Sequence, residues 1–156
     1  MSTGLRRRGR EFALKIIYSG QNQTAPLRVV LDDFWKNFRF NEDILGDPQD
    51  DMAEPIPLEV RRFAEDLASK TLENLPRIDG IIGEFSTNWS LERMARVDLS
   101  LLRMATCELL FLPEVPGNVA INEAIEIGKR YGTKETPAFV NGILDKISRN
   151  YRPNGQ

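Results

Sequence analysis

The chain has 156 residues, of which 41% are hydrophobic and 28% are charged, and this balance is typical of one folded globular domain. No apolar run approaches the roughly 20 residues of a membrane span, and no apolar segment follows the basic N-terminus, so we expect neither an anchor nor a signal peptide. A single cysteine, Cys107, excludes an intramolecular disulfide and fits the cytoplasm, the predicted location. Histidine is absent, which removes the commonest general base and metal ligand. We therefore expect a protein that is not an enzyme and that uses no metal or cofactor.

The net charge of −2 conceals a segregation of charge along the chain. Residues 5–15 are rich in arginine and lysine, whereas residues 32–59 are rich in aspartate and glutamate. Because screening limits the reach of a distant charge to about 8 Å at physiological salt, a local basic segment can bind phosphate even in an acidic protein. The acidic composition therefore does not exclude a nucleic-acid ligand.

Apolar residues recur at helical spacing in the first half of the chain, and no strand-like alternation is seen. We predict a first helix that closes near Gly20, a second that starts at Pro26, a third after Pro57 and a fourth opened by Pro76. The apolar face of the fourth is predicted to run on through Phe85 and Trp89. Residues 41–57 are acidic and broken by glycine and proline, which predicts an exposed loop.

Apolar residues recur at helical spacing in the second half of the chain as well. We predict a short turn after Ser90, a strongly apolar helix from about residue 97 to 112, a helix capped by Asn118, and a last helix that starts at Thr136. Cys107 lies in the apolar helix and is expected to be a buried structural thiol. The pattern therefore predicts an all-α fold of about seven helices, in one domain that divides into two packed sub-bundles.

Arginines cluster at the start of the first predicted helix, at positions 6, 7, 8 and 10. Arg6 and Arg10 are one helical turn apart, and cations at a helix N-terminus oppose the macrodipole, so local electrostatics does not favour the cluster. Guanidinium groups match phosphate oxygens bidentately, which makes RNA or DNA a candidate ligand. A solvated face that keeps the protein soluble is an equal alternative on these residues alone.

A second group of basic and aromatic residues lies around positions 129–139, where one predicted helix ends and the last one begins. Rings interleaved with cations are typical of single-stranded RNA sites, where bases stack on the rings. Ordinary C-terminal charges and a core phenylalanine explain the same residues equally well. The polar pairs Asn122-Glu123 and Asn141-Gly142 are expected to fix the packing of the last two helices, with Gly142 permitting close helix approach.

Together these segments resemble the NusB family of bacterial transcription antitermination factors. The resemblance covers the first helix and most of the chain from about residue 60 onward, and its C-terminal blocks are very specific. The segments that carry it are residues 6–18, 102–105, 108–109, 119–132 and 139–146. The resemblance implies a helical fold of two three-helix-like halves with an additional helix, in one RNA-binding domain of residues 1–156.

The resemblance also implies the ligand and the partners. These are boxA, a single-stranded element of ribosomal RNA leaders, NusE (the small-subunit ribosomal protein S-ten) and the RNA polymerase antitermination complex. By position, the RNA-contact candidates are Arg6, Arg7, Arg8, Arg10, Tyr18, Lys134, Glu135 and Phe139, with Arg103 as a weaker one. Asp98 matches an acidic position that faces the protein partner. The chain departs from the family at Gly9, where many members have alanine, and at Pro137 and Ala138, which replace more polar residues.

Two alternatives stay open. One is a NusB-like domain separated from a ribosomal RNA cytosine methyltransferase, since such domains occur fused ahead of that enzyme; the chain ends shortly after the last predicted helix, which disfavours this alternative. The other is a protein-only helical adaptor whose arginines are solubilising. The sequence also leaves open a homodimer, which would mask part of the RNA surface.

Overall fold

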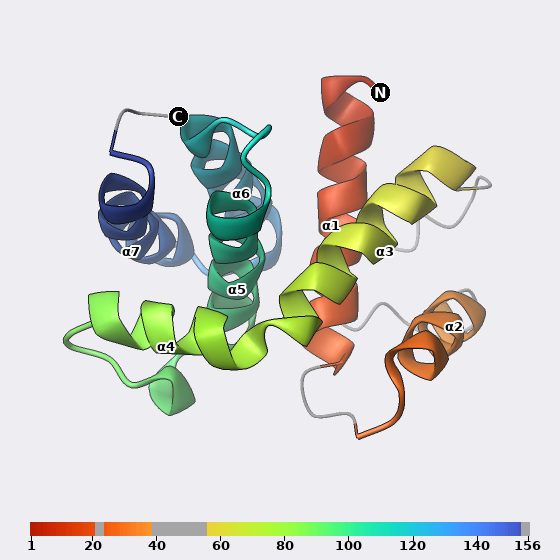
Figure 1. Cartoon of the computed structure of the whole chain (residues 1–156), viewed down its shortest axis with the longest axis horizontal. Helices are drawn as coiled ribbons and strands as arrows, with labels where there is room; N and C mark the ends of the chain where they lie inside the picture. Colours follow the sequence, from red (N-terminus) through yellow and green to blue (C-terminus); the bar gives the residue numbers. More distant parts are fainter. Residues whose placement is uncertain (21–23, 39–55, 154–156) are drawn as a thin grey trace. The chain divides into compact units, whose positions relative to one another are not determined.

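The computed structural model describes residues 1–20, 24–38 and 56–153, so the loop predicted at 41–57 lies, except for its last two residues, outside the described residues. The described residues form seven α-helices and one short 3-10 helix and contain no strand, which confirms the predicted all-α fold (Figure 1). None of these helices is long and apolar enough to cross a membrane. The elements are α1 (Thr3–Gly20), α2 (Leu27–Phe38), α3 (Leu58–Glu73), α4 (Leu75–Phe85), η2 (Leu91–Arg93), α5 (Arg96–Phe111), α6 (Gly117–Tyr131) and α7 (Thr136–Tyr151).

The chain divides into two compact units, Met1–Leu72 and Glu73–Gln156. In the first unit, α1, α2 and α3 each bury one apolar face, as their helical periodicity predicts. The rings of Phe12 on α1 and Trp35 on α2 pack with their centroids 5.5 Å apart. Such tilted aromatic pairs contribute about 1 kcal/mol beyond the area that they bury.

Polar contacts tie α2 to α3 at the edge of this core. The Trp35 indole donates a hydrogen bond to Glu65 at 2.9 Å, and Arg28 donates to both Asp32 and Glu65, at 2.7 and 2.9 Å. The hydrogen bonds to Asp32 and then to Glu65 raise the pKa of the Arg28 guanidinium above its ordinary value. Arginine is protonated in proteins at any physiological pH, so this shift changes no charge near neutrality.

In the second unit, α5 lies against α4, α6 and α7 (Figure 1). Because three helices cover it, α5 is buried over most of its circumference, and Leu101, Leu102 and Met104 are fully buried. Cys107 is a buried free thiol, as predicted. Pro113 follows the end of α5, where the sequence predicted that the helix must stop.

The buried Arg152 guanidinium satisfies the backbone carbonyls at the end of α5. It donates hydrogen bonds to the carbonyl oxygens of Glu108, Leu109 and Leu112, each at 2.9 Å, and of Val115 at 2.6 Å. The last four carbonyls of a helix have no partner within the helix, so an external donor is needed where that end is buried. Arg152 therefore connects the chain just beyond α7 to the end of α5.

Three local predictions are wrong. The helix α4 ends at Phe85, so Trp89 lies outside it and is 51% exposed rather than part of a buried stripe. The N-cap of α6 is Pro116, not Asn118, and no side-chain cap is formed there. Gly142 does not permit a close helix approach, because a Cβ built at this exposed residue would meet nothing within 4 Å. Asn141 is exposed as well, so this pair does not fix helix packing.

Candidate nucleic-acid interface

The predicted arginine cluster lies on the first two turns of α1, where the four side chains differ in exposure. Arg6 is exposed and Arg7 and Arg8 are half-buried, whereas Arg10 is only 3% exposed. The guanidinium of Arg8 lies 5.6 Å from the centroid of the Phe12 ring. A guanidinium over an aromatic face keeps its charge while its stem covers apolar surface. Arg6, Arg7 and Arg8 therefore keep part of their surface available to phosphate groups.

Arg10 has a packing role that the sequence did not reveal. Its guanidinium lies 5.5 Å from the centroid of Phe63 on α3, and the neighbouring Gly9 lies against the same ring, where a Cβ would come within 2.5 Å of Phe63 Cδ1. Gly9 therefore provides room for Phe63. Lys15, which belongs to the same basic segment of the sequence, is fully buried and adds nothing to the surface charge. An RNA contact by Arg10 stays a prediction, and its replacement would disturb packing as well.

Tyr18 lies toward the other end of α1 and is half-buried. Arg7 and Tyr18 are separated by about three helical turns, roughly 16 Å, so they lie on the same side of α1. An arginine and an aromatic ring in line along one helix can contact a phosphate and a base of one extended strand. The first unit thus places five RNA-contact candidates on one helix, namely Arg6, Arg7, Arg8, Arg10 and Tyr18.

In the second unit, the candidates Lys134, Glu135 and Phe139 lie at the turn between α6 and α7 and on the first turn of α7. Lys134 and Glu135 are exposed, and the Thr133 hydroxyl donates a hydrogen bond to Glu135 at 3.2 Å. The half-buried ring of Phe139 meets the indole of Trp89 edge to face, with centroids 6.1 Å apart and planes at 87°. The structure therefore brings all three to one end of α7.

The other two predicted site residues have partners within the second unit. Thr136 donates a hydrogen bond to the half-buried carboxylate of Asp98 at 2.7 Å, which fixes that carboxylate near the start of α7. Arg103 donates two hydrogen bonds to Asp79, both at 2.8 Å, and its side chain is 12% exposed. This bidentate pair uses two of the five guanidinium N–H donors, and the largely buried side chain leaves little surface for RNA, so Arg103 is the weakest of the candidates.

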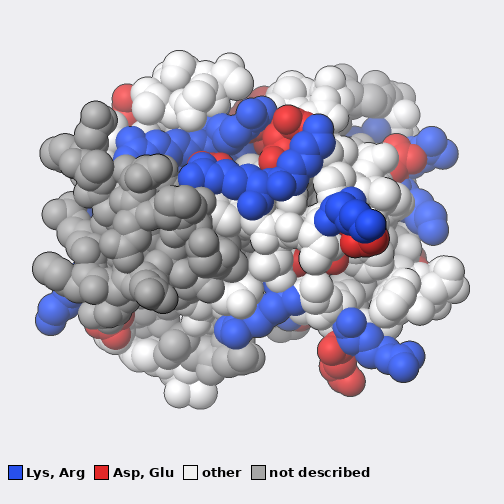
Figure 2. Space-filling view, turned by 180° about the vertical axis from the view of Figure 1, so that it is seen from behind, with Lys and Arg blue, Asp and Glu red and all other residues white. Residues whose placement is uncertain are grey.

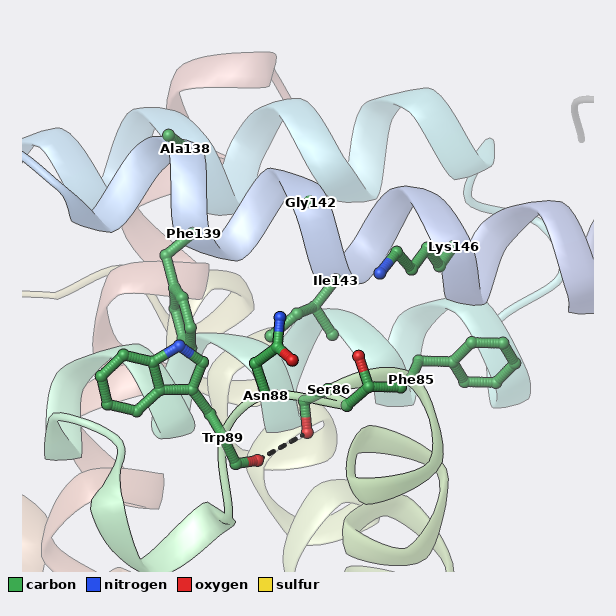
Figure 3. Close-up of a pocket in the computed structure, with 10 residues that line it drawn as sticks. Phe85, Ser86, Asn88, Trp89, Ala138, Phe139, Gly142, Ile143 and Lys146 are labelled. Atoms are coloured by element: carbon green, nitrogen blue, oxygen red, sulfur yellow. Dashed lines mark hydrogen bonds between the residues drawn. The ribbon is translucent and has the colours of Figure 1, made fainter.

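A surface hollow of about 240 Å³, which we did not predict, lies between the turn after α4 and one side of α7 (Figure 3). Its lining includes Trp89, Phe139 and Lys146. Trp89 could have indicated this hollow. The poor helix formers Thr87 and Asn88 precede it and favour a turn, which exposes the ring, over a continued helix.

Charge on the described surface is mixed. On the face shown in Figure 2, lysine and arginine side chains lie beside aspartate and glutamate, with uncharged surface between them. Examples of such pairing are Lys129 with Glu126 at 2.7 Å and Arg149 with Asp145 at 3.0 Å. Among the described residues, no group of three or more cysteine, histidine, aspartate or glutamate side chains is placed to hold a metal ion.

The chain is similar to known proteins over nearly its whole length. The model of the NusB family matches residues 7–149. The transcription antitermination protein NusB of Syntrophotalea carbinolica is 63% identical over 153 residues, 98% of this chain and 97% of that protein. The crystal structure of T. maritima NusB is 34% identical, with a TM-score of 0.76, and covers 99% of this chain and 96% of its own.

A further similar structure is that of antitermination factors NusB and NusE in complex with dsRNA. Its matching chain is 19% identical, with a TM-score of 0.75 over 96% of this chain and all of its own, and at this identity it shows the fold alone. The family match over most of the chain and the 63% identity to a NusB protein go further. They show that the chain belongs to the NusB family of transcription antitermination proteins, which are not enzymes.

Proposed function

We propose that this chain binds single-stranded boxA RNA of ribosomal RNA leaders jointly with NusE, within the antitermination complex of RNA polymerase. The observation that carries the proposal is the row of candidates on α1, where accessible arginines and Tyr18 share one helix in a member of the NusB family. A similar fold occurs in a structure with NusE and RNA, which supports the choice of partners.

The mechanism is binding without turnover, by residues 1–156 acting as one RNA-binding domain. Arg6, Arg7 and Arg8 hold phosphates of the RNA backbone, because a guanidinium forms charge-assisted hydrogen bonds to phosphate oxygens and releases condensed counterions. Phe139 and Tyr18 offer rings to unstacked bases, and NusE supplies further contacts. Phosphate contacts position the RNA, whereas contacts to bases select its sequence.

The proposal is tested by fluorescence anisotropy of a labelled boxA-like RNA, with and without purified NusE, at two salt concentrations. We expect salt-sensitive binding that tightens when NusE is present. If NusE bound the chain but RNA bound neither the chain nor the complex, the protein-only adaptor would replace this proposal.

Replacing Arg7 by alanine is expected to weaken boxA binding without unfolding the protein. Loss of one phosphate contact lowers the slope of log affinity against log salt by about 0.7 for a single strand, and affinity near physiological salt by roughly five- to tenfold. The measurement is the same anisotropy titration at several salt concentrations. Arg62, exposed on α3 outside the predicted surface, is the matched control for loss of one positive charge. Unchanged affinity and slope in Arg7→Ala would remove the arginines from the proposed site.

Replacing Asp98 by asparagine is expected to weaken NusE binding about fivefold and to leave the binding of RNA alone unchanged. Asparagine can still accept the hydrogen bond from Thr136, so the variant removes charge while it keeps local geometry. Calorimetric titration with NusE measures the effect, and Asp145→Asn, which removes a carboxylate from α7, is the control. Equal NusE affinity for Asp98→Asn and the unmodified chain would exclude Asp98 from the partner interface.

A further inference from the structure

Trp89 is displayed on the surface by a turn that is fixed on both sides. The Trp89 amide donates a hydrogen bond to the Ser86 carbonyl oxygen at 3.1 Å, and the Ser86 hydroxyl donates to the Trp89 carbonyl oxygen, also at 3.1 Å (Figure 3). The indole nevertheless remains 51% exposed. Phe139 meets it at 87°, so neither ring stacks on the other. A large apolar ring is thus held in place with much of its surface left to a ligand.

Gly142 keeps the space beside these rings open. It lies in the middle of α7 and lines the hollow, and a Cβ added there would meet nothing within 4 Å. Glycine is among the least favourable residues in a helix interior, where it costs about 1 kcal/mol relative to alanine. Among the residues that the structure describes, none lies within 4 Å of the Cβ position of Gly142, so packing against them does not explain the glycine. A glycine at this point instead lets a ligand approach the backbone of α7 closely.

The polar groups of the hollow suit a nucleic acid. No carboxylate is among the described residues that line it, although the chain as a whole is acidic. Lys146 supplies a cation and Asn88 supplies an amide with both a donor and an acceptor. Among the described residues, neither side chain has a hydrogen bond or an ion pair. At about 240 Å³ the hollow is below the roughly 300–1,000 Å³ of pockets for drug-sized ligands, so it suits one ring system.

We propose that this hollow binds one unpaired nucleobase of the RNA, stacked on Trp89, with Lys146 at the adjoining phosphate and Asn88 at the edge of the base. The inference rests on the proposed RNA-binding function and adds to it a base-binding site formed by the turn after α4 and the middle of α7. Stacking on an aromatic ring is tolerant of base identity, so selectivity here depends on Asn88.

The test uses the full chain and a labelled boxA-like RNA, with and without NusE. Trp89→Ala is expected to weaken RNA binding about tenfold, as loss of one stacked base does, whereas Trp89→Phe retains a ring and most of the affinity. Trp89 is the exposed member of the chain's two tryptophans, since Trp35 is 6% exposed. Quenching of tryptophan fluorescence by RNA should therefore follow the anisotropy curve and disappear in Trp89→Phe.

Gly142→Leu tests the hollow without changing either ring. It is expected to fill the hollow and reduce RNA affinity several-fold, while the thermal midpoint stays at or above that of the unmodified chain, since leucine is a better helix former. Gly80→Leu is the matched control, because Gly80 is an exposed glycine of α4 whose added Cβ would also meet nothing within 4 Å. This control is expected to bind RNA normally.

The outcomes separate the two proposals. Normal RNA binding by both Trp89→Ala and Gly142→Leu, with Arg7→Ala still impaired, would overturn the base-binding site and leave the proposed function standing. Quenching of Trp89 by NusE alone, with no further change on adding RNA, would also overturn it and assign the hollow to a protein contact. If the unmodified chain bound no RNA even with NusE, the proposed function itself would fail.

Discussion

Replacing Arg152 by alanine is expected to lower the free energy of unfolding by about 3–4 kcal/mol. The guanidinium donates to four backbone carbonyls at and beyond the end of α5, and Glu108 and Leu109 there are 0% and 2% exposed. The Glu108 and Leu112 carbonyl oxygens also accept hydrogen bonds from backbone amides, at 3.1 and 3.0 Å. Truncation therefore leaves mainly the Leu109 and Val115 carbonyls without a donor, at about 1–3 kcal/mol for each. Partial relaxation keeps the total below the simple sum. Urea unfolding followed by circular dichroism measures the change, and the thermal midpoint should fall by roughly 10 °C.

Two further variants show whether the geometry or the charge of the Arg152 guanidinium provides this stability. Arg152→Lys keeps the charge but lacks the planar fork, so it is expected to recover only part of the lost stability. Arg149→Ala, near the end of α7, removes an arginine whose side chain is 80% exposed and paired with Asp145, and should change stability by less than about 0.5 kcal/mol. Stability of Arg152→Ala within 1 kcal/mol of the unmodified chain would contradict the role assigned to the guanidinium.

The sequence predicted the helices well because the signals for them are local. Prolines at positions 26, 57, 76 and 137 each lie beside or in the first turn of a helix, and Pro113 follows the end of another. Apolar spacing within each segment then identified the buried face. The same spacing wrongly extended the fourth predicted helix to Trp89, although α4 ends at Phe85. Periodicity shows which face of a helix is apolar but does not show where the helix ends.

The parts that could not be predicted depend on contacts between residues distant in the sequence. Arg152 donates hydrogen bonds to carbonyl oxygens of residues 37 to 44 positions earlier in the sequence. No local pattern indicates that an arginine beyond the last helix binds the carbonyls at the end of α5. Arg10 appears equivalent to Arg6 on a helical wheel, but Phe63 lies against it from another helix and it is buried. The open space beside Gly142 could not be predicted, because it depends on which residues of other segments lie near this position. Motif positions thus supplied the candidates for RNA contact, which stay predictions, whereas the exposure of each candidate required the structure.

Gly132, at the end of α6, lies in a place where even a methyl group does not fit. Its φ of −97° is available to any residue, so the restriction is steric rather than conformational. A Cβ built there would lie 2.6 Å from Thr136 Cβ and 2.7 Å from Thr136 Cγ2. Thr136 is 1% exposed, and its hydroxyl donates to Asp98 at 2.7 Å and accepts from the Thr133 amide at 3.0 Å. Thr136 therefore cannot move aside without breaking these hydrogen bonds.

Gly132→Ala is accordingly expected to lower the free energy of unfolding by about 2–3 kcal/mol, through overpacking and loss of the Thr136 hydrogen bonds. Gly142→Ala, with open space at its Cβ, is expected to raise it by about 0.5–1 kcal/mol, because alanine is the better helix former. Denaturant unfolding of both variants measures two changes of opposite sign. Were Gly132→Ala as stable as the unmodified chain, Thr136 would have to be free to move, and the fixed position of Asp98 at the proposed partner surface would be lost with it.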